Sequence, residues 1–495
     1  GISVAAENGM GIVGVAPEAE LVSLRLIGST DPVNYDKDIT GKTIAAALFN
    51  LFRNQESDIL TNSWGPMNMI QQSLALAALE QGVNQGRNGL GNIYVFAAGN
   101  DGALDGNVNY NYFANSRYTI AVGAATRNDV QSPYSTPGAA LLISAYSDNG
   151  SGESAESIMT TALDDWYADD FGGTSAAAPL VSGAVALMLE VNPNLTWRDV
   201  QHILVQTARR DGITDPAANW SGKEGDAIRH SDKYGFGIID AAAAVNLARN
   251  WTPVAAEVPV IREFELDSVN QVIPTLDNLS VGDRLTAADS TIIQQNIKVE
   301  SVEVGLSLTH PDWRDLTVVL TSPTGTQSIL AKAIPPEKRT SDDGIKQGET
   351  RKHWTFNSVR HWGESSQGEW TLQVFDQQGN EVEGTWHDWK LNIHGTSNEP
   401  QPNVTIRTTD AKATEEGDTA QFVVTRDGDL NAPLTVNYVI AGTALNGTDY
   451  KELIGTVTIE AGKASGTIGA VPILDYLTEE NETVTLTLRD TNTYN

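Results

Sequence analysis

The sequence contains no cysteine, and basic residues are scarce. Without cysteine the chain can form no disulfide, no thiolate metal site and no thiol nucleophile. The 495 residues include 63 acidic and 32 basic side chains, a formal net charge of −31. This acidic excess disfavours nucleic acid and anionic membranes as partners, and it favours solubility and cation binding. Calcium held by carboxylates is therefore the expected means of cross-bracing.

Long apolar runs and a signal peptide are also missing. The longest apolar run, residues 176–189, is interrupted by Pro179 and is shorter than the roughly 20 residues that a membrane-spanning helix needs. It predicts a buried helix. The N-terminus shows no basic stretch followed by an apolar one. The chain starts without methionine and closes on residues 490–495, directly after a strand-like run at 483–488, so we expect both ends to be cut.

The remaining composition is that of a globular protein, with 40% hydrophobic and 19% charged residues. Residues 1–252 alternate predicted strands (21–27, 59–62, 93–98 and 118–123) with predicted helices (44–53, 71–85 and 176–190). This alternation predicts an α/β domain with a doubly wound parallel sheet. Residues 257–396 and 403–495 carry short strands between turns, which predicts two β-sandwiches joined by a polar linker, 397–402.

Two motifs in the first domain carry residues suited to acyl transfer. Gly172-Gly-Thr-Ser-Ala-Ala-Ala-Pro179 places Ser175 at the start of the apolar helix, where aligned backbone amides favour both a nucleophile and a developing oxyanion. Val95-Phe-Ala-Ala-Gly-Asn100 places the Asn100 carboxamide on a glycine turn after a buried strand. Taken singly, the first motif is an ordinary glycine turn with a capping serine, and the second is an ordinary turn.

A third segment has the features of a substrate-binding strand. Residues 58–66 form a predicted strand that ends in Ser63-Trp64-Gly65, and the free edge of such a strand can pair with an extended peptide. By itself the segment reads equally well as a core strand.

In this order, and with Gly11-Ile-Val-Gly-Val-Ala-Pro17 upstream, the three segments resemble the subtilase family. Residues 62–66, 115–123, 196–204 and 234–237 resemble its kexin/furin branch, and the resemblance covers nearly all of residues 1–250. It implies a serine endopeptidase that acts through an acyl-enzyme on protein or peptide substrates. Ser175 would be the nucleophile, and Asn100 with the Ser175 amide would form the oxyanion hole. The implied substrate-binding residues are Ser63, Trp64, Gly65, Asn68 and Asn111.

The other two domains have resemblances of their own. Residues 309–325, 362–372 and 386–395 resemble the P domain that follows kexin-type catalytic domains, where it stabilises them. Residues 403–495 resemble a Calx-beta module. The resemblance implies a secreted or cell-surface protein. It also implies a calcium site among Glu415, Asp449, Asp475, Glu479 and Glu482. A solvated acidic loop explains the same composition. The turn at Asn8 resembles a further calcium site of the family.

No histidine precedes Ser175, although the family order is Asp, His, Ser. The resemblance places the missing His-Gly-Thr motif about six residues before residue 1, so we expect a truncated chain that is close to inactive by itself. His202 and His230 are predicted to be structural. The alternatives are a pseudoprotease that serves adhesion or protein binding, and a β-sandwich adhesin with an enzyme remnant.

The specificity pocket also departs from the family. Asn68, Asn111 and Thr136 occupy positions where the resemblance leads us to expect carboxylates. The hypothesis is a pocket that has lost its calcium ion and its strict demand for arginine.

Overall fold

The computed structural model describes residues 1–24, 41–48, 57–65, 73–153, 156–162, 164, 166–223, 225–263, 267–273, 287–339, 351–377, 383–398, 402–428, 430, 433–474, 480–489 and 494. The chain divides into two compact units. The first comprises Gly1–Pro253 and Glu257–Thr396, and the second comprises Ser397–Asn495 with Val254–Ala256. The first two predicted domains thus pack into one unit.

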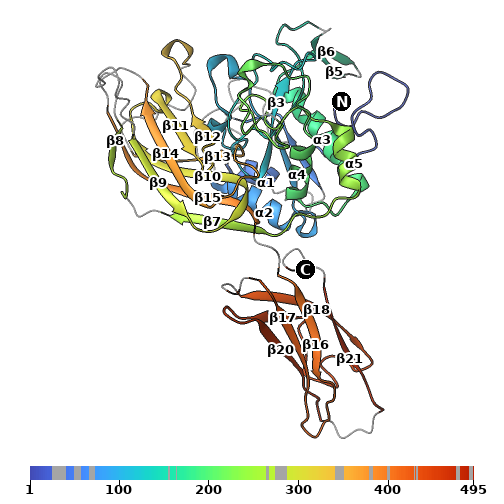
Figure 1. The fold of residues 1–495 in the computed structure, drawn as a ribbon. Coiled ribbons are helices and arrows are strands. Elements are labelled where there is room, and N and C mark those ends of the chain that lie inside the picture. Colours follow the sequence, from blue (N-terminus) through green and yellow to red (C-terminus); the bar gives the residue numbers. More distant parts are fainter. Residues whose placement is uncertain are drawn as a thin grey trace. The chain divides into compact units, whose positions relative to one another are not determined.

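A parallel four-stranded sheet lies at the centre of the first part of this unit (Figure 1). Its strands, in spatial order, are β1 (Ile59–Asn62), β2 (Ile93–Ala97), β3 (Thr119–Ala125) and β4 (Ile143–Tyr146). Every residue of β2 and β3 is buried, as expected for a parallel sheet covered on both faces. Ile93 and Val95 face one hydrophobic core, whereas Tyr94 and Phe96 face another.

Helices cover both faces of this sheet. The helices are α1 (Gly41–Leu48), α2 (Ser73–Gln85), α3 (Thr174–Val191), α4 (Trp197–Thr207) and α5 (Ala241–Arg249). The Tyr94 and Phe96 side packs against α1 and α2, and the opposite side packs against α3, α4 and α5. The doubly wound sheet predicted from the alternating pattern is confirmed. A small hairpin, β5 (Ile158–Thr161) and β6 (Tyr167–Phe171), precedes α3.

The apolar run predicted as a buried helix forms α3. This helix contacts all four strands of the sheet. Among the described residues it alone is long and apolar enough to cross a membrane, and 56% of it is buried inside the protein, as in the core helix of a globular domain. The next helix, α4, begins with the predicted cap: Thr196 accepts a bond from the Asp199 amide, and the Asp199 carboxylate accepts from Thr196.

One predicted strand of this domain is wrong in its described part. Residues 21–24 form no strand, and 25–27 lie outside the described residues. Residues 16–22 and Leu24 instead line a groove of about 1320 Å³ together with β1. The predicted helix 44–53 is described to Leu48 only.

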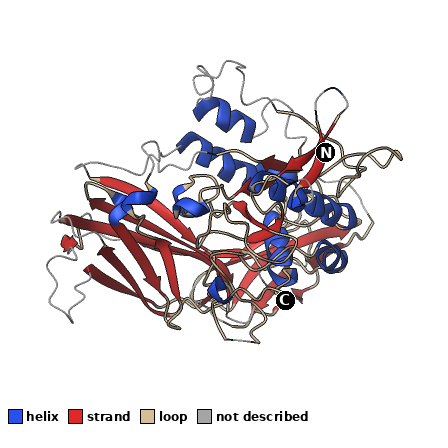
Figure 2. Ribbon diagram, turned by 90° about the horizontal axis from the view of Figure 1, so that it is seen from above, coloured by secondary structure: helices blue, strands red, loops and turns tan. Residues whose placement is uncertain are grey.

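The rest of the first unit is a β-sandwich. One sheet has the order β13-β10-β15-β7, with β8 also paired to β15, and the other has the order β12-β11-β14-β9. The strands are β7 (Glu257–Glu263), β8 (Gln271–Ile273), β9 (Ala287–Ile293), β10 (Ile297–Thr309), β11 (Leu316–Thr321), β12 (Gln327–Ala331), β13 (Lys352–Ser358), β14 (Gly368–Asp376) and β15 (Gly384–Ser397). Figure 2 shows the strand-rich part beside the part that holds the helices. Alternate residues of β14 are buried, which is the pattern of a half-covered strand.

The second unit is a smaller β-sandwich. Its sheets have the orders β16-β17-β20 and β19-β18-β21. The strands are β16 (Val404–Asp410), β17 (Ala420–Arg426), β18 (Leu434–Gly442), β19 (Thr456–Ile459), β20 (Ser465–Ala470) and β21 (Val484–Leu488). Both predicted sandwiches are confirmed as all-β regions, and the exact domain boundaries stay predictions.

Candidate active site

Ser175 is the second residue of α3, at the carboxyl edge of the parallel sheet. The residue before the helix, Gly173, has φ 77° and ψ 173°, a left-handed conformation that strains any residue with a Cβ. The helix therefore starts abruptly, and Ser175 lies in its first turn, where backbone N–H groups have no acceptor within the helix. Its side chain is half-buried. A serine in this position is accessible and lies among the first-turn backbone N–H groups of the helix.

The Asn100 carboxamide is fixed beside this helix start. Its Oδ1 accepts from the Thr174 backbone N–H at 2.9 Å and from the Thr174 hydroxyl at 3.0 Å. The Nδ2 group lies beside Gly173, since a Cβ on Gly173 would stand 3.2 Å from it. The residue is exposed. With the oxygen engaged twice, the Nδ2 group remains as the donor of this exposed side chain.

The turn at Gly173 is hydrogen-bonded to Asp148. The Asp148 carboxylate accepts from the Gly173 N–H at 2.9 Å and from the Tyr134 hydroxyl. Burial raises the pKa of Asp148, but the donors around it outweigh burial, and its pKa is lowered. A Cβ on Gly172 would stand 2.1 Å from the carboxylate. The Gly-Gly pair before Ser175 is therefore needed for this approach. The sequence analysis did not find Asp148, because no local pattern links it to residue 173.

Three of the predicted substrate-binding residues, Ser63, Trp64 and Gly65, directly follow β1. Ser63 donates to the Ser175 carbonyl at 3.0 Å. Trp64 contacts Phe96 and Phe113 edge to face, so its partly buried side chain packs against the core. A Cβ on Gly65 would stand 3.0 Å from the Asn111 amide nitrogen. The structure thus brings Ser175, Ser63, Gly65 and Asn111 to one edge of the sheet.

Asn111 is buried, with its Oδ1 accepting from the amides of Phe113 and Ala114. Thr136 is buried as well, and its hydroxyl accepts from the Asp101 amide at 2.9 Å. Asn68 lies outside the described residues. The two described positions of the expected pocket are therefore neutral side chains engaged with the backbone around them.

Each of the seven histidines contacts side chains or backbone groups other than Ser175. His202 lies 3.0 Å from Glu300 and packs on Trp362. His230 is fully buried, and burial lowers its pKa to about 3. The other five, which follow residue 300, contact sandwich residues. His202 and His230 therefore have structural neighbours, in line with the role predicted for them.

The first sandwich is hydrogen-bonded to the loop that carries Asn111. The Asn109 amide donates to the Leu330 carbonyl at 2.9 Å, and the Trp354 indole donates to the Asn109 carbonyl at 3.0 Å. Asn115 bonds the backbone of β13 in both directions, at 2.6 Å and 2.8 Å. The sandwich thus sets the position of a loop at the candidate site.

The candidate calcium residues of the second unit are partly described. Strand register places the strand ends that flank 411–419, 443–455 and 471–483 at one end of this sandwich. Glu415, Asp449 and Glu482 each belong to one of these loops, whereas Asp475 and Glu479 lie outside the described residues. Asn8, in the first unit, is exposed, and its Oδ1 accepts from the Met10 amide at 3.0 Å.

Comparisons with known proteins agree with this architecture. Residues 1–237 match the family model of the subtilase family, residues 299–393 match the proprotein convertase P-domain and residues 398–495 match the Calx-beta domain. Proprotein convertase subtilisin/kexin type 6 of Rattus norvegicus is 35% identical over 409 residues, which is 81% of this chain and 41% of the relative. Kexin of Saccharomyces cerevisiae is 33% identical over 399 residues, 78% of this chain and 45% of the relative.

A solved structure shows the same fold. The crystal structure of the serine protease of Aeromonas sobria superposes with a TM-score of 0.66 at 23% identity, over 80% of each chain. The chain spans less than half the length of the two relatives named above. It consists of a subtilase-family domain, a proprotein convertase P-domain and a Calx-beta domain, in that order, and is related to the kexin-like proprotein convertases.

Proposed function

We propose that this chain is part of a serine endopeptidase that cleaves peptide bonds through an acyl-enzyme, with Ser175 as nucleophile and Asn100 as an oxyanion-hole donor. The observation that carries the proposal is the pair of bonds from Thr174 to the Asn100 oxygen, at 2.9 and 3.0 Å. They fix a carboxamide against the first turn of the helix that carries Ser175. Such preorganised donors stabilise developing charge because they need not reorient during the reaction.

The chemistry divides between residues present here and residues that must come from elsewhere. Ser175 attacks the scissile carbonyl, and the Asn100 Nδ2 group and the Ser175 N–H receive the oxyanion. The backbone at Ser63–Gly65 lies where an extended substrate can pair with it. A general base is required to take the Ser175 proton. In this proposal the base and its orienting carboxylate are contributed by sequence that precedes Gly1.

The experiment is to read the reading frame upstream of Gly1 and to treat two proteins with a fluorophosphonate serine-hydrolase probe. We expect an Asp motif and a His-Gly-Thr motif upstream, rapid labelling of the complete protein, and at least about 1000-fold slower labelling of the 495-residue chain, since the nucleophile lacks its base. A complete protein without both motifs that is never labelled would support the pseudoprotease alternative.

The neutral pocket supports a proposal on specificity. Asn111 and Thr136 carry no charge, and their polar atoms bond the surrounding backbone, so they offer little to a basic side chain or to a cation. We expect the complete enzyme to cleave after several residue types. A peptide-library profile with arginine alone before the scissile bond would contradict this expectation.

Calcium belongs to the proposal through the loops of the Calx-beta domain. Glu415, Asp449 and Glu482 belong to three connections whose flanking strand ends lie at one end of the sandwich, and carboxylates are the ligands that a hard cation prefers. Calcium at 100 times its dissociation constant is expected to stabilise this domain by about 2.7 kcal/mol. Thermal unfolding with calcium or with EGTA measures it, and an Asp449→Asn variant should lose the effect. Equal midpoints in calcium and EGTA would leave the loops as solvated acidic turns. A secreted or cell-surface location is part of the same proposal.

A further inference from the structure

The P-domain contains a buried group of three side chains that the proposed proteolysis does not use. They are His310, Asp315 and Asp376, and one ligating atom of each lies within 4.8 Å of those of the other two. The side chains of His310 and Asp376 are fully buried, and that of Asp315 is 3% exposed. Charge buried in this way is costly unless it is paired or coordinates a metal ion.

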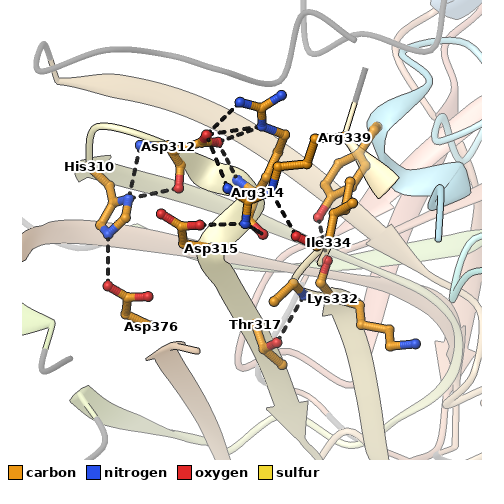
Figure 3. Close-up of polar contacts among 11 residues, drawn as sticks. His310, Asp312, Arg314, Asp315, Thr317, Lys332, Ile334, Arg339 and Asp376 are labelled. Atoms are coloured by element: carbon orange, nitrogen blue, oxygen red, sulfur yellow. Dashed lines mark hydrogen bonds and ion pairs between the residues drawn. The ribbon is translucent and has the colours of Figure 1, made fainter. Parts of the chain in front are cut away.

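Strand pairing brings these residues together although they are far apart in sequence. His310 follows β10 directly, Asp315 immediately precedes β11, and Asp376 is the last residue of β14. Leu316 of β11 is the register partner of Asp376. The turn between β10 and β11 therefore folds over the end of β14, and Figure 3 shows the imidazole between the Asp312 backbone and the Asp376 carboxylate.

The backbone selects the tautomer of His310. Its Nδ1 lies 2.8 Å from the Asp312 carbonyl oxygen and 3.2 Å from the Asp312 amide nitrogen. The shorter contact is a hydrogen bond when Nδ1 carries a proton and donates it to the carbonyl. In the neutral imidazole the Nε2 lone pair then faces Asp376, and a proton or a metal ion must lie between Nε2 and the carboxylate oxygen. An imidazole whose other nitrogen donates to a backbone carbonyl is the usual arrangement of a metal-binding histidine.

The distance between His310 and Asp376 helps to identify this cation. His310 Nε2 is 3.3 Å from an Asp376 oxygen. A hydrogen bond between an imidazolium and a carboxylate is typically about 2.7–2.9 Å long. Two ligands bound tetrahedrally to zinc at about 2.0–2.1 Å are about 3.3 Å apart. The observed separation is therefore long for a shared proton and fits a shared metal ion.

Two neighbouring guanidinium groups pair with carboxylates at or beside the triad. Arg314 pairs with Asp312 at 2.6 Å and 2.8 Å, and Asp312 is not a member of the triad. Arg339 donates to one oxygen of Asp315 at 2.5 Å and lies 3.5 Å from Asp312. A hydrogen bond to a ligating carboxylate orients it, as outer-shell partners do in metal sites. The competing arrangement is an imidazolium at His310, which would balance the charges of three carboxylates and two guanidinium groups.

We propose that His310, Asp315 and Asp376 bind one divalent transition-metal ion, with zinc as the best candidate, and that this ion ties the β10–β11 turn to the end of β14. An imidazole with two carboxylates suits zinc. Calcium is a poor fit because it takes six to eight oxygen ligands.

Isothermal titration of the metal-free 495-residue chain with zinc chloride, in excess calcium, tests the site. Excess calcium is included so that the carboxylate loops proposed above to bind calcium do not contribute to the zinc signal. We expect one zinc ion per chain and a rise of several degrees in the unfolding midpoint of the first unit. Asp376→Asn should weaken zinc binding at least about 100-fold, since it removes a ligand. Glu369→Gln, an exposed carboxylate on the same strand, should change nothing.

Two outcomes overturn the proposal. A folded wild-type chain whose midpoint and heat signal are unaffected by zinc would assign the cation to a proton on His310. Zinc binding that survives in Asp376→Asn would place the metal elsewhere. If Asp376→Asn does not fold, His310→Gln replaces it, and the wild-type titration alone still decides between metal and proton. Neither result depends on the proteolytic function.

Discussion

Replacing Ser175 by alanine in the complete protein is expected to lower kcat by about 10⁵- to 10⁶-fold. The loss is this large because the nucleophile and its base act as one unit, and only the oxyanion hole and substrate binding remain. Those remnants still give about 10³- to 10⁴-fold catalysis over water. Hydrolysis of a peptide substrate, with active sites counted by the fluorophosphonate probe, measures the effect.

A matched control separates chemistry from folding. Ser151 is an exposed serine, and Ser151→Ala should keep full activity and labelling. Asn100→Ala should lower kcat by a smaller factor, about 10²- to 10³-fold, with KM little changed, because its donor acts mainly on the charged intermediate. A Ser175→Ala protein that is still labelled would show that another residue is the nucleophile.

Replacing Glu300 by glutamine is expected to destabilise the first unit by about 3–5 kcal/mol. Glu300 lies in β10 of the P-domain with 8% of its side chain exposed. It accepts from the Arg198 guanidinium at 2.9 Å and 2.5 Å, and His202 lies 3.0 Å away. Glutamine cannot neutralise Arg198, which would keep a buried charge without its counter-ion. Urea unfolding followed by tryptophan fluorescence measures the change.

The lowered pKa of Glu300 predicts that stability falls at low pH, which gives the stability curve an acid limb. Burial raises the pKa of Glu300, but hydrogen bonds and charges from His202 and Arg198 outweigh burial and lower the pKa to about 2, from an ordinary value of 4.5. Its contribution is therefore present above about pH 4.5 and is lost as the pH falls toward 2. Glu300→Gln should flatten this limb, whereas Glu337→Gln, an exposed carboxylate of the same domain, should keep it. An unchanged limb in Glu300→Gln would show that another carboxylate controls it.

The sequence allowed much of the fold to be predicted, because strands and helices follow local periodicity. The buried helix at Ser175 and the Thr196 cap are local patterns of this kind. The partners of His202 and the approach of Asp148 to Gly173 could not be predicted. Glu300 is in another domain from His202, and Asp148 reaches Gly173 through a fold of the chain rather than through spacing. The roles of Ser175 and Asn100 were inferred from resemblance, since neither motif is specific by itself.

The hydrogen bonds between the P-domain and the Asn109–Asn115 loop affect how domains of such proteins can be exchanged. The hydrophobic core that contains Phe113 also contains Trp354 and residues of β10, so it is continuous across the predicted boundary near residue 253. A chimera that joins this subtilase domain to a foreign P-domain keeps the shared core only if the foreign P-domain supplies the residues that contact this loop. Exchange of the two domains as a single cassette preserves the core, and exchange of one alone divides it.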